Sequence, residues 1–277
     1  MQARRDGQRE DSSVVAPRTS LIDDRLVDVV RVLFAQSVKL RYRGSALGIL
    51  WSALSPLAMA AVYASVFGRT FARYYDDSVF LYAAAVYIGL ALIGFFIGAT
   101  SECSTAIVQN GGLLNKIRIP FEAFPLASIA AQAFQLLTGC VSIMVVLALV
   151  MTHDLVHVVL LVIPLVSLLM LATGVGIFIS GVGVFFRDTP HLYELATFLL
   201  WVTSPVFYPA AIVPLRLQQV LVFNPLYPIL TAARDLVLTP SLPPLWMFGF
   251  SLAEGALALL LGVAAFARMR RHFMDHV

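Results

Sequence analysis

The chain has 277 residues, of which 60% are hydrophobic and only 13% are charged, and its mean hydropathy is +0.86. A soluble core of this size cannot bury so much apolar surface, so the composition excludes a soluble protein and predicts an integral membrane protein. The net charge is +3 and the pI is about 9.0. Because the basic residues gather on one predicted membrane face, this charge does not indicate nucleic-acid binding.

The first 43 residues are polar and charged and divide into two parts. Residues 1–19 are predicted to be a disordered tail, and residues 20–43 an amphipathic helix. At about 100° per residue its apolar and charged residues fall on opposite faces. The apolar face holds Ile22, Leu26, Val29, Val30, Leu33 and Leu40, and the charged face holds Asp24, Arg25, Asp28, Arg31, Lys39 and Arg43. A helix of this kind directly before a membrane span is expected to lie in the membrane interface.

Five apolar runs are long enough to cross a bilayer, which takes about 20 residues in a helix. They cover residues 46–68, 79–100, 125–151, 155–186 and 245–267. The fourth contains several glycines that allow close helix approach, including Gly174 and Gly183. A sixth run, 195–213, is short and interrupted by Pro205 and Pro209, so we expect a broken span. The predicted fold is an all-α membrane protein with six transmembrane helices.

A second broken segment follows at residues 220–233, which is too short to cross and contains Pro225 and Pro228. It is expected to be re-entrant or to lie at the surface. Irregular backbone at membrane depth is tolerated only where protein or a water-filled path covers it. The region 204–233 therefore points to a translocation route, and the alternative is a long structured external loop.

The Lys and Arg residues are distributed unevenly between the two membrane faces. With six spans, fifteen of the 19 lie on the face that holds both termini. The other face holds Arg69, Arg73, Arg216 and Arg234. The positive-inside rule then predicts that both termini are cytoplasmic. The early residues lack the apolar core of a cleavable signal peptide, so we expect the first span to serve as the anchor.

The predicted cytoplasmic loop between the second and third spans contains a short helix at about residues 110–121. A Gly111-Gly112 turn precedes residues 113–119, and Pro120 ends the segment. Its basic residues are Lys116 and Arg118. The mixed apolar and basic composition fits a docking element for a partner protein, and it equally fits an ordinary loop with inward-facing charge.

Motifs for chemistry are missing from the sequence. It contains no GxxxxGK[ST] phosphate loop, so any ATP dependence must come from a partner. It contains neither HExxH nor CxxC, and its five histidines are scattered, so no metal site is predicted. Glu254 is a single carboxylate inside the last span, and either a functional or a structural role is consistent with that position.

A set of ordered motifs resembles the type-2 ABC exporter permeases that move polysaccharides such as O-antigen, teichoic acid and capsule. The motifs are Arg41 to Trp51 (RYRGSALGILW), Ser55-Pro56-Leu57, Val66-Phe67-Gly68, Lys116 to Pro120 (KIRIP), Phe186-Arg187-Asp188, Ser204 to Pro209 (SPVFYP), and Asn224-Pro225 followed by Arg234. They follow the order and spacing of the family over nearly the whole chain after Leu21, so residues 44–277 resemble one permease domain.

The resemblance implies a homodimer in the bacterial inner membrane with two copies of a separate ATPase. ATP and Mg would be bound by that ATPase, and this chain would bind no cofactor. The residues expected to couple the permease to the ATPase are Leu113, Leu114, Asn115, Lys116, Ile117, Arg118, Arg187 and Asp188. The substrate expected from the resemblance is a glycan linked to a polyprenyl pyrophosphate.

Three further groups of residues are candidates for contact with such a substrate. Arg31, Arg41 and Arg43 can attract the pyrophosphate, because charge pairing with phosphate is strong at a membrane surface. The candidate channel-lining residues are Trp51, Tyr63, Phe67, Trp201, Phe207 and Tyr208, and the alternative for Trp51 and Tyr208 is an aromatic belt at the membrane border. The candidate re-entrant exit residues are Pro205, Pro209, Asn224 and Pro225.

Other functions remain open at this point. A type-2 permease for a small lipid or drug would share the topology. A membrane glycosyl- or acyltransferase would need paired carboxylates or a His and Asp cluster near one face. Asp76 and Asp77 are adjacent but have no histidine beside them, and they are next to Arg73. A purely structural scaffold would not explain the two proline-broken segments.

Overall fold

The computed structural model describes residues 19–45, 47–114, 119–214, 221 and 224–275, which contain helices and loops and no β-strand. Five helical segments are long and apolar enough to cross a membrane, namely Leu50–Tyr74, Val79–Gln109, Ala123–Thr152, Leu155–Phe185 and Leu245–Phe273. They coincide with the five uninterrupted apolar runs. The prediction of an all-α membrane protein is therefore confirmed, and the chain is a multi-pass membrane protein.

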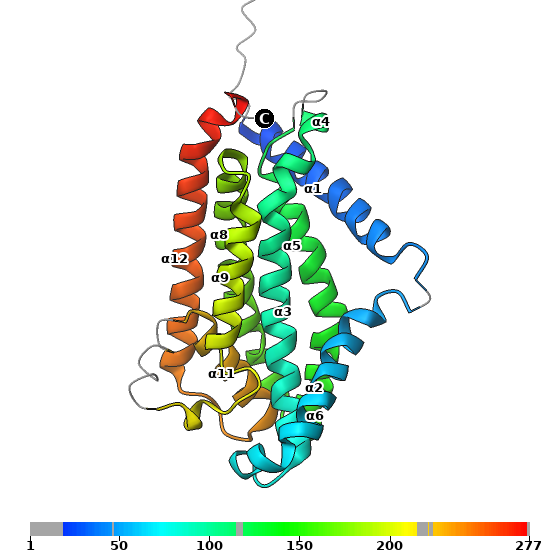
Figure 1. The fold of residues 1–277 in the computed structure, drawn as a ribbon, viewed down its shortest axis with the longest axis vertical. Helices are drawn as coiled ribbons and strands as arrows, with labels where there is room; N and C mark the ends of the chain where they lie inside the picture. Colours follow the sequence, from blue (N-terminus) through cyan, green and yellow to red (C-terminus); the bar gives the residue numbers. More distant parts are fainter. Residues whose placement is uncertain (1–18, 46, 115–118, 215–220, 222–223, 276–277) are drawn as a thin grey trace, which may run out of the picture.

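The helices run side by side as a bundle, with α1 crossing it obliquely (Figure 1). In chain order they are α1 (Thr19–Tyr42), α2 (Leu50–Phe71), α3 (Val79–Gln109), α4 (Gly111–Leu114), α5 (Ala123–Gln135), the π-helix η2 (Leu136–Val141), α6 (Ser142–Thr152), α7 (Leu155–Leu160), α8 (Val162–Phe185), α9 (Thr189–Thr203), α11 (Leu226–Leu238) and α12 (Leu245–Met269). Three short 3₁₀ turns are η1 (Ala72–Tyr74), η3 (Ala210–Ile212) and η4 (Arg270–Asp275).

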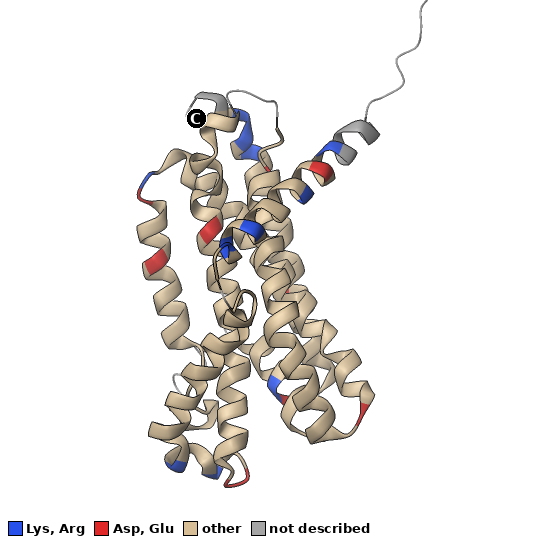
Figure 2. Ribbon diagram, turned by 90° about the vertical axis from the view of Figure 1, so that its right-hand side faces the viewer, with Lys and Arg blue, Asp and Glu red and all other residues tan. Residues whose placement is uncertain are grey.

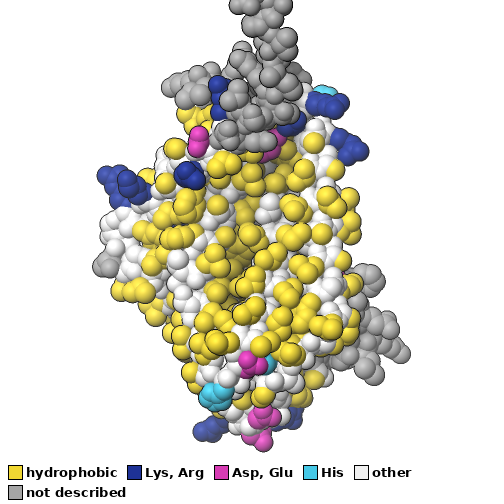
Figure 3. All heavy atoms as spheres, turned by 180° about the vertical axis from the view of Figure 1, so that it is seen from behind, with side chains coloured by type: hydrophobic (Ala, Val, Ile, Leu, Met, Phe, Trp, Pro, Cys, Tyr) yellow, Lys and Arg dark blue, Asp and Glu magenta, His cyan; other side chains and the backbone are white. Residues whose placement is uncertain are grey.

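The two ends of the bundle are polar and its middle is apolar. We call the end that holds α4 and η4 the proximal end, and the end that holds α11 the distal end (Figure 1). Lys, Arg, Asp and Glu gather toward these ends and along α1 (Figure 2). Hydrophobic side chains cover the middle of the face seen in Figure 3. This distribution is the one a bilayer-spanning bundle requires.

Helix α3 forms the centre of the bundle and packs against α2, α5 and α8. Tyr82, Tyr87 and Leu92 are among its fully buried side chains. Glycines set the closest helix contacts, as predicted for the fourth span. A Cβ on Gly174 would overlap the backbone of α12, and one on Gly183 would overlap the carbonyl of Ser104 in α3.

The two proline-broken segments differ from their predicted boundaries. The run predicted at 195–213 forms α9, which begins at Thr189 and ends at Thr203, after 15 residues. At about 1.5 Å per residue, α9 is shorter than the roughly 30 Å hydrocarbon core. The segment predicted at 220–233 contains α11, which continues to Leu238. Most of α11 is buried against α3, α6 and α8, so this segment is packed into the helical bundle.

Helix α1 covers the segment predicted to lie in the membrane interface and packs against α5. The rings of Phe34 and Phe134 meet edge to face, with centroids 5.8 Å apart. Leu26 and Leu33 on the predicted apolar face are partly buried, whereas Arg31 is exposed. Leu40 departs from the predicted pattern, because its side chain is 60% exposed near the end of the helix.

Candidate functional site

Five of the six predicted channel aromatics form one continuous group, which we call the aromatic cluster: Tyr63, Phe67, Trp201, Phe207 and Tyr208. Tyr63 stacks on Phe207 with ring centroids 5.5 Å apart and ring planes inclined by 14°. Trp201 and Tyr208 both contact the same Phe207 ring. The cluster joins α2 to the end of α9 and the irregular segment after it.

Trp51 is not part of the aromatic cluster. It lies in the first turn of α2, and its side chain is 53% exposed. Its role as a channel-lining residue stays a prediction, and Trp51 lies twelve residues before Tyr63 along the same helix. At about 1.5 Å per residue that separation is roughly 18 Å.

A single arginine fixes the irregular segment that follows α9. Arg234 in α11 donates hydrogen bonds to the carbonyls of Ala85 (2.9 Å), Pro205 (2.6 Å) and Val206 (2.6 Å). Pro205 and Val206 follow the end of α9, so their carbonyls need donors from outside that helix. We call this arrangement the Arg234 clamp. It attaches both broken segments to α3, the central helix.

Two further contacts hold the same segment at the distal end. Asn224 is 5% exposed, and its amide donates to the Ser204 hydroxyl at 2.8 Å. Its side-chain oxygen accepts from the backbone N–H of Leu226 at 3.0 Å, at the start of α11. The Tyr82 hydroxyl donates to the carbonyl of Phe207 at 2.8 Å. Pro205 and Pro209 are both buried, and Pro225 directly precedes α11.

The predicted headgroup arginines have different surroundings. Arg41 forms an ion pair with Glu102 of α3, and the amide of Gln132 in α5 donates to the same Glu102 oxygen at 2.6 Å. Arg41 and Glu102 remain partly exposed, at 30% and 37% of their side-chain surface. Arg31 and Arg43 are exposed. The structure thus connects α1, α3 and α5 through one carboxylate.

The predicted coupling segment is described only in part. Leu113 and Leu114 lie in α4 at the proximal end, whereas Asn115, Lys116, Ile117 and Arg118 lie outside the described residues. Arg187 and Asp188 are exposed between α8 and α9.

A proximal aromatic group packs against the end of the coupling segment. Phe273 in η4 is fully buried, and its ring meets those of Phe121, Phe185 and Phe266 at 5.2 to 5.7 Å. Arg270 donates to Glu122 at 2.6 Å beside it. The C-terminal turn is therefore packed directly against the end of the coupling segment.

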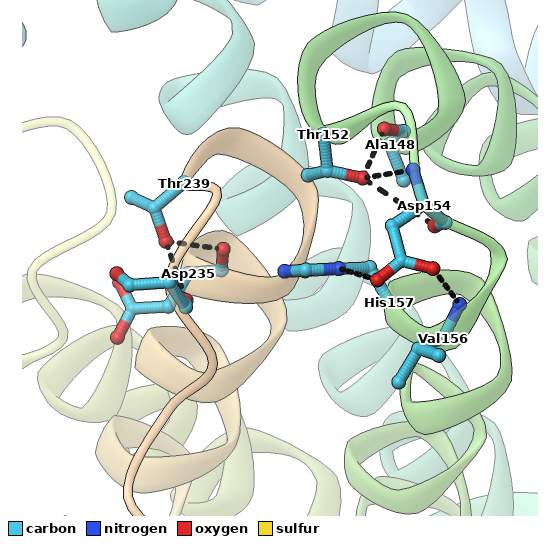
Figure 4. Close-up of polar contacts among 8 residues, drawn as sticks. Ala148, Thr152, Asp154, Val156, His157, Asp235 and Thr239 are labelled. Atoms are coloured by element: carbon cyan, nitrogen blue, oxygen red, sulfur yellow. Dashed lines mark hydrogen bonds and ion pairs between the residues drawn. The ribbon is translucent and has the colours of Figure 1, made fainter.

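A polar cluster at the distal end involves His157, which the sequence analysis sets aside. His157 is 3% exposed, and its Nδ1 lies 3.8 Å from Oδ2 of Asp154. Asp154 caps α7 by accepting from the N–H of Val156 at 2.9 Å. The His157 ring points from α7 toward α11, which carries Asp235, and Thr239 follows at its end (Figure 4). Helices α7 and α11 pack against each other here.

Glu254 lies in α12, and its Oε2 is buried with no hydrogen-bond partner among the described residues. Within the part of the chain that the structure describes, no three His, Cys, Asp or Glu side chains gather in a way that could hold a metal ion.

Several residues of the site are absent from the sequence-based prediction. Glu102, Glu122, Arg270 and Phe273 carry no motif that marks them. Glu102 and Glu122 were nevertheless detectable as acidic residues beside predicted spans, where an uncompensated charge requires a partner. The identity of that partner depends on the fold.

Comparison with known proteins identifies the family of this chain. The family described as ABC-2 type transporter matches residues 28–238. An "O-antigen export system permease protein RfbA" from Klebsiella pneumoniae is 24% identical over 90% of this chain and 95% of its own length. A protein of the same description from Myxococcus xanthus is 26% identical over 86% and 91%, and the "Polysialic acid transport protein KpsM" of Escherichia coli is 25% identical over 76% and 81%. The matched region includes the aromatic cluster and the Arg234 clamp, and the chain belongs to the ABC-2 type transporter family.

Proposed function

We propose that this chain is the membrane-spanning permease subunit of an ATP-driven exporter that moves a lipid-linked polysaccharide across the bacterial inner membrane. The observation that carries the proposal is the similarity, over three quarters or more of the chain, to proteins described as O-antigen export and polysialic acid transport proteins. The aromatic cluster supports it, because aromatic faces stack on sugar rings without requiring one particular sugar sequence, which suits a polymer that slides.

The subunit acts as a homodimer with two copies of a separate ATPase, which bind ATP and Mg. The proximal end faces the cytoplasm and receives the ATPase through residues 113–118 and through Arg187 and Asp188. Closure of the ATPase moves the coupling segment, and the packing of Phe273 against Phe121 carries that movement to α8 and α12. Each subunit then has six helices at membrane depth, of which the short helix α9 is the fifth, and these helices line the transport route.

The polyprenyl pyrophosphate enters near the start of α2. Arg43 lies between α1 and α2, and Arg31 lies in α1. Both side chains are exposed and attract the phosphate groups. Arg41 assists from its position beside Glu102, where its positive charge is partly neutralised. The glycan passes the aromatic cluster and leaves beside Pro205, Pro209, Asn224 and Pro225 at the distal end.

The proposal is tested by the ATPase activity of the complete transporter in lipid nanodiscs, using this chain with the ATPase encoded beside it. We expect polyprenyl-linked glycan to stimulate ATP hydrolysis. Stimulation only by small lipids or drugs would assign the chain to a different class of cargo. Failure of the two proteins to associate would overturn the proposal of an ABC permease.

A further inference from the structure

A cavity of about 280 Å³ lies between α2, α3 and α5, separate from the aromatic cluster. Its aromatic lining residues are Trp51 and Phe95, and its polar lining includes Ser52, Ser55, Gln132 and Gln135. None of the described residues that line it is charged. The volume is just below the usual range for small-molecule sites, about 300–1,000 Å³, so the cavity has room for a small ring and not for a polymer.

One polar group in the cavity wall has no partner within the described chain. The amide nitrogen of Gln135 is buried and makes no hydrogen bond. A buried donor without an acceptor is destabilising, so it favours a ligand that brings an acceptor. The π-helix η2 begins directly after Gln135, and such turns are frequent at functional sites.

The α2 wall of the cavity is held in place by a hydrogen bond to a carbonyl that Pro56 leaves without its helical donor. Pro56 has no N–H, so the Ser52 carbonyl one turn earlier lacks its helical donor. The Cys140 thiol of η2 donates to that carbonyl at 3.2 Å. Trp51 and Ser55 are four residues apart and thus lie on one face of α2. The contact fixes this face opposite Gln135.

A glycine keeps the third wall open. Gly94 is exposed in the middle of α3, although most of its neighbours on that helix are buried. A Cβ added to Gly94 would meet no atom within 4 Å. The space next to Gly94 is therefore not required for packing of the described residues.

The cavity adjoins the predicted headgroup arginines. Gln132 lines it and donates at 2.6 Å to the Glu102 oxygen that is also paired with Arg41. One carboxylate therefore separates the cavity from a cation suited to phosphate. A lipid-linked sugar presents the same order of groups, with a phosphate next to its first ring.

We propose that this cavity binds the lipid-proximal sugar ring of the substrate, with its phosphate groups at Arg41 and Arg43. The inference rests on the proposed function. The neutral lining selects an uncharged ring, the Trp51 face contacts its C–H groups, and the Gln135 amide donates to a hydroxyl or acetamido oxygen. Ser52 and Ser55 are available for the remaining hydroxyls.

The test compares binding of two probes to the complete transporter in nanodiscs: polyprenyl pyrophosphate carrying one N-acetylglucosamine, and polyprenyl pyrophosphate alone. We expect the first to bind at least about fivefold more tightly, as an added hydrogen bond and ring contact predict. Gly94→Leu fills the cavity and should remove this difference without weakening the sugar-free probe. Gly249→Leu is the matched control, since a Cβ at Gly249 in α12 also meets nothing within 4 Å.

A second variant distinguishes binding of a sugar from binding of an acyl chain, because only a sugar can accept a hydrogen bond from Gln135. Gln135→Met keeps the size of the side chain and removes the unpaired donor. We expect it to lose the preference for the sugar-bearing probe and to unfold at a temperature no lower than wild type. Equal affinity of wild type for the two probes, or an unchanged preference in both cavity variants, would overturn the sugar site. Stimulation of ATPase activity by polyprenyl-linked glycan in wild type would still support the proposed function.

Discussion

Arg234 donates a 2.6 Å hydrogen bond to the carbonyl oxygen of Pro205, a residue of the irregular segment that follows α9. The same guanidinium also binds Ala85 and Val206, so it replaces the helical donors that the broken segment has lost. The irregular backbone there is a fixed element of the structure, supported by a planar cation with several donors.

Replacing Arg234 with Met should destabilise the protein strongly. The change leaves the carbonyls of Pro205 and Val206 without their Arg234 donors, at about 1–3 kcal/mol for each buried group. Thermal unfolding of the purified protein in detergent measures the effect. Arg69→Met, at an exposed position near the end of α2, is the matched control and should change the midpoint little. Equal midpoints for the two variants would contradict the clamp.

The stacked pair Tyr63 and Phe207 should show energetic coupling. Replacing either by Ala removes the contact between α2 and the irregular segment. A double-mutant cycle on the free energy of unfolding should give a coupling of about 0.5–1.5 kcal/mol, typical of aromatic pairs. Phe207→Tyr is the conservative control and should retain most of it. Strictly additive single changes would show that the two rings do not support each other.

The ion pair between Arg41 and Glu102 predicts a charge-reversal rescue. Arg41→Glu places two carboxylates together and should lower stability, whereas adding Glu102→Arg should restore it. Because both side chains are partly exposed, we expect the pair to contribute only about 0.2–1 kcal/mol. Thermal unfolding of the single and double variants measures this, and a double variant as unstable as Arg41→Glu would argue against the pair.

Arg43 should affect transport and leave the fold intact. It is exposed, so Arg43→Ala should keep the unfolding midpoint and assembly with the ATPase. Export of lipid-linked glycan should fall, and the double variant with Arg41→Ala should fall further. Export can be followed in cells and assembly by co-purification. Loss of assembly in either variant would mean that the arginines are structural.

Close packing of α8 on α12 makes Gly262 intolerant of a side chain. A Cβ there would overlap the backbone of Gly174, so Gly262→Ala should cost about 1–3 kcal/mol of stability, as overpacking generally does. Gly249→Ala in the same helix meets nothing within 4 Å and should be neutral or slightly stabilising. Similar unfolding midpoints for both alanine variants would show that the helices can separate freely.

The sequence predicts the spans well because hydropathy is a local property. Five apolar runs coincide with five long helices, and Pro205 marks where the interrupted run leaves the helix. The boundaries of α9 and α11 are less predictable. Thr189 begins α9 outside the apolar run, and α11 continues past the charged Arg234 because that residue finds carbonyl partners in the fold.

The tertiary contacts of the site could not be predicted from the sequence. Arg270 and Glu122 are 148 positions apart, and Arg41 and Glu102 are 61 apart. Each lies near a predicted membrane border, so a need for charge pairing is readable, but the choice of partner depends on helix packing. Tyr63 and Phe207 are both predicted from the sequence as channel-lining aromatics, but the sequence does not predict that their rings stack on each other.

The π-helix at Leu136–Val141 has a consequence for insertions and deletions in this helix. Its wider turn accommodates one more residue than an α-helical path would, and each residue advances an α-helix by about 100°. Gln135 before the turn faces the cavity, whereas Met144 and Ala148 after it lie buried in α6, which packs on α11. Deleting one residue within 136–141 would restore a regular helix and rotate α6 by about a quarter turn relative to α5. Gln135 could then not face the cavity while Met144 and Ala148 stay buried.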